Sequence, residues 1–129
     1  MKKMLQIIVV ATIIIFPAKI FSQNYSVNTV ETLKGQIIRI DKMSSGKNSS
    51  GIHLLLKTDK DSIAVHVGPE WYVAKQKVQL NVNDNIEVKG SRTMYNNKPA
   101  IIAAEIKKIN STLTLRDSKG FPLWSGRNK

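Results

Sequence analysis

The chain has 129 residues, no cysteine, and 20 basic against 9 acidic side chains, which gives a net charge of +11. The absence of cysteine excludes disulfide bonds, a thiol nucleophile, thiolate-bound metals and a lipid anchor attached at a cysteine. The length allows one hydrophobic core. The positive charge favours anionic partners, with simple solubility as the alternative, because the lysines are scattered rather than gathered in one run.

The first 22 residues have the organisation of a cleavable signal peptide. Lys2 and Lys3 precede an apolar run, Met4 to Phe16, of about 13 residues, which is shorter than the ~20 residues of a membrane-spanning helix. Ser22 is a small residue suited to cleavage, so we expect the mature chain to begin at Gln23. Removing the segment's three lysines lowers the net charge from +11 to +8. We expect a periplasmic or secreted protein without a later membrane span, and an uncleaved anchor is the alternative.

In chain order, residues 23–32 are polar and predict a flexible N-terminal arm. The stretch Lys42 to Gly51 is rich in serine, glycine and asparagine and predicts an exposed loop. Pro69 to Gln76 fits one or two helical turns with proline first. Residues 110–129 predict an appended hairpin, with Trp124 packed on the barrel or facing a ligand, and a basic tail. Alternating apolar residues predict five strands: Leu33 to Ile40, Gly51 to Thr58, Asp61 to Val67, Asn85 to Ser91 and Ala100 to Ile109.

Hydrophobic alternation fixes the register of the second and third strands. A two-residue turn at Asp59-Lys60 sets Leu56 opposite Ile63, so that the apolar residues of both strands share one face. The same register sets His53 directly opposite His66 on the other face. The only two histidines of the chain are therefore predicted to be neighbours.

The order of strand, loop, strand, tight turn, strand, short helix, strand, turn, strand resembles an OB-fold. Gly35-Gln36-Ile37-Ile38 opens the first strand, and Val82 to Gly90 (VNDNIEVKG) is similar to the G-D-x-V-x-V-x-G pattern of the fourth strand, with Asn83 where glycine is common. With the export signal, residues 33–109 resemble the bacterial periplasmic OB-fold proteins. The resemblance implies an all-β, five-stranded barrel with one short helix and a binding role, but no particular ligand.

The His53 and His66 pair predicts a weak transition-metal site, with no other cofactor expected. Two neutral imidazoles can bind copper, zinc or nickel if a third ligand approaches. Glu70 and Met94 are the candidates for that ligand. The alternative is an ordinary exposed pair across two strands.

Trp71 and Tyr72 follow a Gly-Pro turn and are candidates to stack on a sugar or a base. In the alternative, which the sequence favours, Trp71 plugs the bottom of the barrel and Tyr72 covers its rim.

OB-folds commonly bind ligands on the face of strands two and three, beside the loops that flank it. Here Lys57 belongs to the second strand, and the turn from Arg92 to Lys98 between the last two strands offers cations beside an aromatic ring, which suits a polyanion or a glycan. Nucleic acid is disfavoured because we expect only one aromatic residue near that face. The predicted ligand-binding residues are Lys57, Trp71, Tyr72, Arg92, Met94, Tyr95 and Lys98.

Catalytic signatures are missing from the sequence, which has no Gly-x-Ser-x-Gly elbow, no glycine-rich phosphate loop and no HExxH helix. The sequence therefore predicts an exported, non-catalytic binding module for an anionic envelope component, a glycan or a small ligand. The alternatives are a metal-binding envelope protein that uses the two histidines and a structural module that binds another envelope protein. The oligomeric state is left open.

Overall fold

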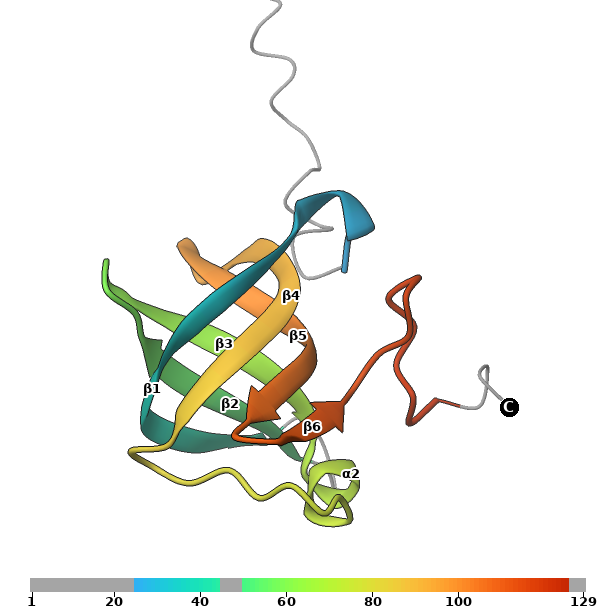
Figure 1. The fold of residues 1–129 in the computed structure, drawn as a ribbon. Helices are drawn as coiled ribbons and strands as arrows, with labels where there is room; N and C mark the ends of the chain where they lie inside the picture. The colour runs from blue at the N-terminus through green and yellow to red at the C-terminus, as the bar shows by residue number, and fades with distance from the viewer. Residues whose placement is uncertain (1–24, 45–49, 126–129) are drawn as a thin grey trace, which may run out of the picture.

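The computed structural model describes residues 25–44 and 50–125, so the predicted signal peptide lies outside the described residues (Figure 1). None of the helices in those two ranges is long and apolar enough to cross a membrane. The described elements are η2 (Val27–Thr29), β1 (Val30–Ser44), β2 (Ser50–Lys57), β3 (Ser62–Pro69), α2 (Glu70–Ala74), β4 (Asn85–Tyr95), β5 (Lys98–Lys108) and β6 (Ser111–Thr114).

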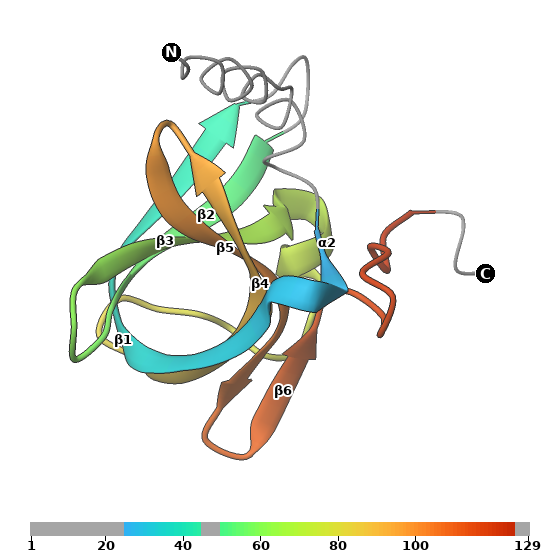
Figure 2. The ribbon, with the colours of Figure 1, turned by 90° about the horizontal axis from the view of Figure 1, so that it is seen from above.

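The first five strands close into a barrel. The strand order is β3-β2-β1-β4-β5-β6, and an additional pairing of β3 with β5 closes the ring. That closing pair is parallel, with Val65 opposite Ile101, whereas the other pairings are antiparallel. Viewed from above, the strands surround a central space with α2 at one side (Figure 2). A five-stranded barrel with one helix between β3 and β4 is an OB-fold, which confirms the predicted fold class.

β1 pairs with β4 through its first part and with β2 through its second part, and this sharing requires close strand crossings. A Cβ atom at Gly35 would lie 2.3 Å from the carbonyl oxygen of Lys57, and one at Gly90 would lie 2.3 Å from that of Ile102. Both positions therefore exclude a side chain. Asn83, which stands where the OB-fold pattern has glycine, adopts a φ of 80°, a conformation that asparagine tolerates.

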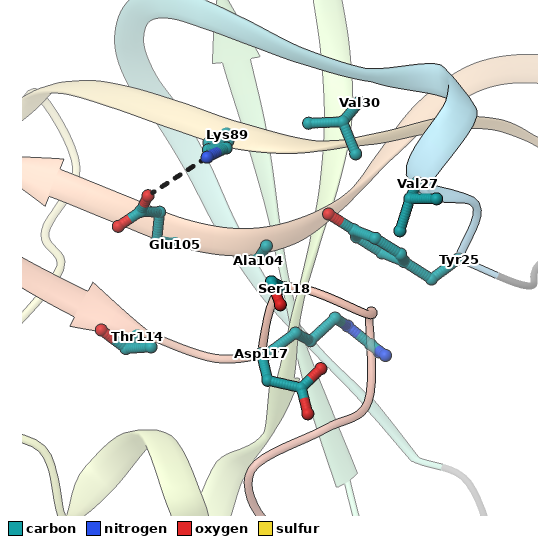
Figure 3. A pocket seen from close by; sticks show the side chains of 10 residues that line it. Tyr25, Val27, Val30, Lys89, Ala104, Glu105, Thr114, Asp117 and Ser118 are labelled. Atoms are coloured by element: carbon teal, nitrogen blue, oxygen red, sulfur yellow. Dashed lines mark ion pairs between the residues drawn. The ribbon is translucent and has the colours of Figure 1, made fainter.

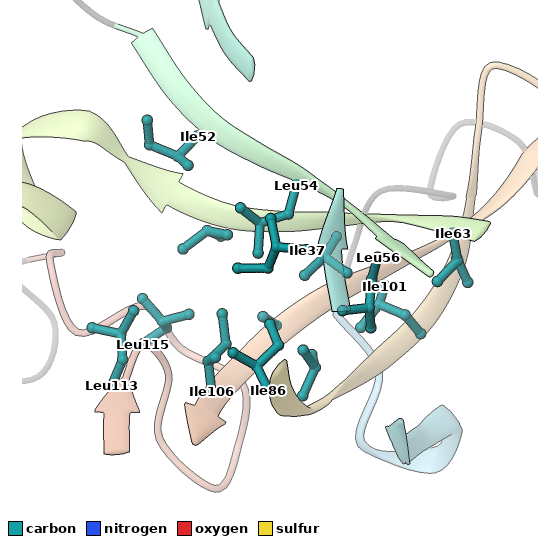
Figure 4. Close-up of a cluster of buried hydrophobic side chains, with 14 of the residues drawn as sticks. Ile37, Ile52, Leu54, Leu56, Ile63, Ile86, Ile101, Ile106, Leu113 and Leu115 are labelled. Atoms are coloured by element: carbon teal, nitrogen blue, oxygen red, sulfur yellow. The ribbon is translucent and has the colours of Figure 1, made fainter. Parts of the chain in front are cut away.

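The core fills the barrel with the inward-facing aliphatic residues of every strand (Figure 4). Ile37, Leu56 and Val88 are fully buried, and α2 closes one end by packing Tyr72 and Val73 against the cluster. Burial of such side chains contributes about 1.5–3 kcal/mol each, which allows a chain without disulfides to fold. The buried cluster consists of Ile37, Ile52, Leu54, Leu56, Ile63, Val65, Val67, Val78, Ile86, Val88, Ile101, Ala103, Ile106, Leu113 and Leu115.

β1 and β4 are several residues longer than the sequence predicted. β1 begins at Val30, because residues 30–36 pair with β4 from Ser91 back to Asn85. β1 also continues to Ser44, which pairs with Ser50, so the described parts of the predicted loop from Lys42 to Gly51, residues 42–44 and 50–51, are strand. Polar residues form strand here because backbone pairing within a hairpin does not need an apolar period.

The register of β2 and β3 is confirmed. Leu56 pairs with Ile63 and His53 with His66, and the backbone N–H of Thr58 donates to the carbonyl oxygen of Asp61 at 2.8 Å. A register shift between Ile52 and His53 was not predicted. It brings Gly68 opposite Ile52 at the end of β3.

The chain beyond β5 adds a strand and a small hairpin. β6 pairs antiparallel with β5, and the next residues form an isolated bridge between Arg116 and Pro122. Trp124 then packs partly buried against the core, as predicted. Its ring lies so close to Gly68 that a Cβ atom there would be 3.0 Å from it.

Candidate functional site

Two histidines and one tyrosine meet on the outer side of β2 and β3, and we call this cluster (His53, His66 and Tyr95) the His–Tyr face. The imidazole rings of His53 and His66 are stacked, with centroids 4.0 Å apart and planes 8° from parallel. The phenol ring of Tyr95 stands edge-on to both, 5.8 Å from His53 and 4.7 Å from His66. The cluster is thus a compact aromatic surface on the face that OB-folds commonly use for ligands.

Strand alternation and one hairpin position these rings. The neighbours of His53 in β2, Ile52 and Leu54, point into the core, so the imidazole points outward. Tyr95 is the last residue of β4, directly before a two-residue turn in which Asn96 and Asn97 have φ values of 52° and 66°. Tyr95 therefore reaches His66 from a different hairpin.

Both imidazoles are neutral at neutral pH. Burial, the neighbouring His53 and the charge of Arg116 together lower the pKa of His66 to about 4. Burial also lowers the pKa of His53, although the nearby carboxylate of Asp41 opposes this effect. The Nε2 atom of His66 is buried and has no hydrogen-bond partner among the described residues. The face is thus aromatic and uncharged at its centre.

The predicted third ligands for a metal do not join the two histidines. The Glu70 carboxylate accepts a hydrogen bond from the Ser50 hydroxyl at 2.9 Å and pairs with Lys42 at 2.8 Å. Met94 precedes Tyr95 in β4, so its side chain points to the other side of the strand. Residues 25–44 and 50–125 contain no group of three or more histidines and acids placed to hold an ion. Because the stacked rings lie in nearly parallel planes, both would have to rotate to share one metal.

The remaining predicted ligand-binding residues of β2, β4 and β5 do not all lie at the His–Tyr face. They are Lys57, Arg92, Met94 and Lys98. Lys57 ends β2 on the same outer side as His53, and Lys98 pairs with Tyr95 across the β4–β5 turn. Neither lysine forms an ion pair with another described residue. Arg92, in contrast, binds Glu31, with its Nη2 atom 3.2 Å from Oε1, and lines a cleft beside the β2–β3 turn. Arg92 and Met94 therefore lie apart from the His–Tyr face.

Trp71 does not plug the barrel, so the favoured interpretation of this residue was wrong. Its side chain is 51% exposed, and the Nζ atom of Lys75 lies 5.2 Å from the ring centroid. Tyr72 occupies the buried side of α2 instead, where its hydroxyl donates to the carbonyl oxygen of Thr114 at 3.1 Å. Trp71 and Tyr72 are adjacent in this five-residue helix, so they point in different directions, and it is Tyr72 that packs against the core. Trp71 remains available to a ligand.

A separate cleft of ≈ 410 Å³ lies over β4, β5 and β6, between the two ends of the described chain (Figure 3). Tyr25 and Val27 form one wall, and Lys89 faces Glu105 across the cleft floor at 4.0 Å. The Arg116 guanidinium lies between the rings of Tyr25 and Trp124, at 5.6 and 5.3 Å. The sequence did not predict this cleft, because residues 25–30 carry no strand or helix period and were expected to be loose.

Comparison with known proteins identifies a family. A solved N-terminal domain of a PriB protein from Thermoanaerobacter tencongensis, described as dimeric, aligns with a TM-score of 0.47 and 15% sequence identity, covering 65% of this chain and 99% of that domain. No curated protein matches the sequence. The family model of the MamS/MamX magnetosome proteins matches residues 29–113, which include the barrel, both histidines and Tyr95. The chain belongs to the MamS/MamX magnetosome protein family.

Proposed function

We propose that the chain is an exported, non-catalytic binding module that holds an anionic envelope component, such as an acidic glycan, against the His–Tyr face. The observation that carries this proposal is the stack of His53 and His66 under Tyr95, on the outer side of β2 and β3. The N-terminal sequence supports export. The family is named for the magnetosome, and we propose that setting for this chain.

The chemistry of the face suits a ligand with both a planar or apolar part and negative charge. The neutral imidazoles and the phenol ring offer a stacking surface, on which sugar rings and other flat groups pack well. Lys98, which pairs with Tyr95, supplies positive charge beside it, and Lys57 adds charge four residues further along the same outer side of β2 from His53. Neither lysine is neutralised by a carboxylate among the described residues. Aromatic and cationic groups together bind such ligands more specifically than charge alone.

The proposal that the chain is not an enzyme is supported by the groups that lie near the imidazoles of His53 and His66. Activation of a nucleophile by histidine requires a hydroxyl or thiol bonded to the ring and an acceptor that orients it. Among the described residues, no hydrogen bond joins either imidazole to a hydroxyl or a carboxylate. The nearest carboxylate of β1, Asp41, is paired with Arg39 at 2.9 Å.

The test is titration of the full chain with polygalacturonate, a carboxylate-bearing glycan, at several salt concentrations. We expect Tyr95→Ala to weaken binding about ten-fold through loss of stacking, and Lys57→Gln and Lys98→Gln to reduce its salt dependence. Lys119→Gln removes one charge from the C-terminal hairpin and is the matched control. If the three variants of the face bind as the wild type does, or if Lys119→Gln loses as much affinity, this assignment of the site is wrong.

The metal alternative is tested in the same protein. Isothermal titration with copper, zinc and nickel salts should show binding that disappears in His53→Ala if the two histidines hold an ion. Unchanged metal binding in His53→Ala would exclude this pair as the site. A structural module that binds another envelope protein would instead show no affinity for the glycan, in the wild type as in Tyr95→Ala.

A further inference from the structure

The turn between β5 and β6 combines two unfavourable features in one residue. Ile109 is 87% exposed, the largest exposed fraction among the large hydrophobic residues that the structure describes. Its backbone also adopts a φ of 55°, in the left-handed region that disfavours a β-branched side chain. A glycine or an asparagine would remove both costs. Backbone strain of this kind persists mainly where function requires it.

Lysines surround this turn. Ile109 lies between two shallow clefts, one of which includes Lys34 and Lys107 and the other Lys77 and Lys108. Lys108 is held by Asp84 at 2.9 Å, whereas the other three have no ion-pair partner among the described residues. One glutamate, Glu87, lines the first of these clefts, where it lies opposite Lys34 on β1 and Lys107 on β5. The exposed isoleucine thus stands at the centre of a positively charged surface.

We propose that this turn docks the barrel on an anionic lipid surface, with Ile109 inserted among the lipid chains and Lys34, Lys77 and Lys107 against the headgroups. An apolar side chain gains free energy when it leaves water for the hydrocarbon boundary. Lysines near a membrane are attracted by anionic lipids. Insertion into lipid accounts for both the exposure of Ile109 and its positive φ, because the strained backbone holds the side chain outward.

The composition of the turn favours a lipid surface over a protein partner. Stable protein interfaces have an apolar centre enriched in aromatic residues, and lysine is depleted in them. This turn offers one aliphatic side chain and several lysines. A fluid bilayer needs no complementary shape, so a single inserted residue with surrounding charge is a sufficient contact, although a weak one.

The absence of cysteine allows a test in the full chain that reports which part touches the membrane. A single cysteine is introduced as Asn110→Cys at the turn or as Lys60→Cys at the β2–β3 turn, and each is labelled with an environment-sensitive fluorophore. Because β3 and β5 run parallel, the β2–β3 turn lies at the opposite end of the barrel from Ile109. With vesicles of phosphatidylcholine and phosphatidylglycerol in equal parts, we expect a blue shift for the label at position 110 and none at position 60. Pure phosphatidylcholine should produce little change.

Two further variants separate insertion from general charge attraction. In the Asn110→Cys background, Ile109→Gly should raise the lipid concentration for half-maximal signal about ten-fold while leaving thermal stability unchanged or higher, because glycine relieves the strained φ. Lys107→Gln should raise it about five-fold, whereas Lys60→Gln, with the same loss of charge, should not. An unshifted label at position 110, an equal shift at position 60, or an Ile109→Gly variant that titrates as the wild type does would overturn the proposal. Capture of a protein through this turn without a lipid response would do the same.

Discussion

Acidification from neutral pH to about pH 4.5 should destabilise the folded chain through His66. Burial and neighbouring positive charge give this imidazole a folded-state pKa of about 4, compared with an ordinary value of 6.5. Between these two values the unfolded chain binds a proton that the folded chain does not, so the free energy of unfolding falls as the pH falls. The contribution of neutral His66 is fully present above about pH 6.5. At 1.36 kcal/mol per pH unit the whole interval corresponds to ~3 kcal/mol, and partial exposure of the ring reduces our expectation to about 2 kcal/mol.

Urea unfolding at a series of pH values, followed by the fluorescence of Trp71 and Trp124, measures this effect. His66→Phe keeps an aromatic ring against His53 and Tyr95 but cannot titrate, so its stability should vary much less between neutral pH and about pH 4.5. His53→Phe should reduce the variation less, because Asp41 opposes the effect of burial at that ring. The lowered pKa values of Glu70 and Asp84 act in the same direction but at more acidic pH. Equal stability of the wild type at both ends of the interval, or an equal loss in His66→Phe, would refute the reasoning.

Three other substitutions test the fold around the site. Gly90→Ala should cost about 2–3 kcal/mol in urea unfolding, because its Cβ atom would lie 2.3 Å from the carbonyl oxygen of Ile102, whereas Gly51→Ala, whose nearest neighbour is 3.8 Å away, should be nearly neutral. Ser91→Ala should cost about 1–2 kcal/mol, since the buried Oγ accepts from the Ser26 N–H at 3.0 Å, and hydrogen exchange at Ser26 should quicken; unchanged exchange would contradict this contact. Tyr72→Phe should cost about 1 kcal/mol through loss of the bond to Thr114, and an unchanged unfolding midpoint would mean that this bond contributes nothing.

The central hairpin of the barrel could be predicted because β2 and β3 alternate strictly between buried and more exposed residues. The period of two in β2 and β3 determined which residues enter the core, and the two-residue turn at Asp59-Lys60 then fixed the register that pairs His53 with His66. Asn96 and Asn97 form the two-residue turn between β4 and β5 with positive φ values, which asparagine adopts more readily than most residues. Local periodicity and turn chemistry are properties of short segments, and a sequence displays them directly.

Contacts between distant segments could not be predicted in the same way. The sequence placed Tyr95 near the binding face but gave no sign that its ring would stand edge-on to both imidazoles, since this depends on how far the β4–β5 hairpin leans over β3. The orientation of α2 is a further example. Five residues are too few for a helical period, so the sequence could not decide whether Trp71 or Tyr72 would face the core. Residues 25–29 looked unstructured because the bonds that hold them, such as that from Ser26 to Ser91, span 65 positions.

The two proposed surfaces are compatible within one barrel because they lie at opposite ends of β5. This strand begins at Lys98, beside Tyr95, and ends at Lys108, directly before Ile109. Its 11 residues extend over roughly 35 Å at about 3.3 Å per residue. A barrel that docks through Ile109 would therefore hold the β4–β5 turn and its aromatic cluster away from the lipid surface, where a ligand in solution can reach them. Loss of docking in Ile109→Gly should accordingly leave glycan binding intact, while Tyr95→Ala should leave the vesicle response intact.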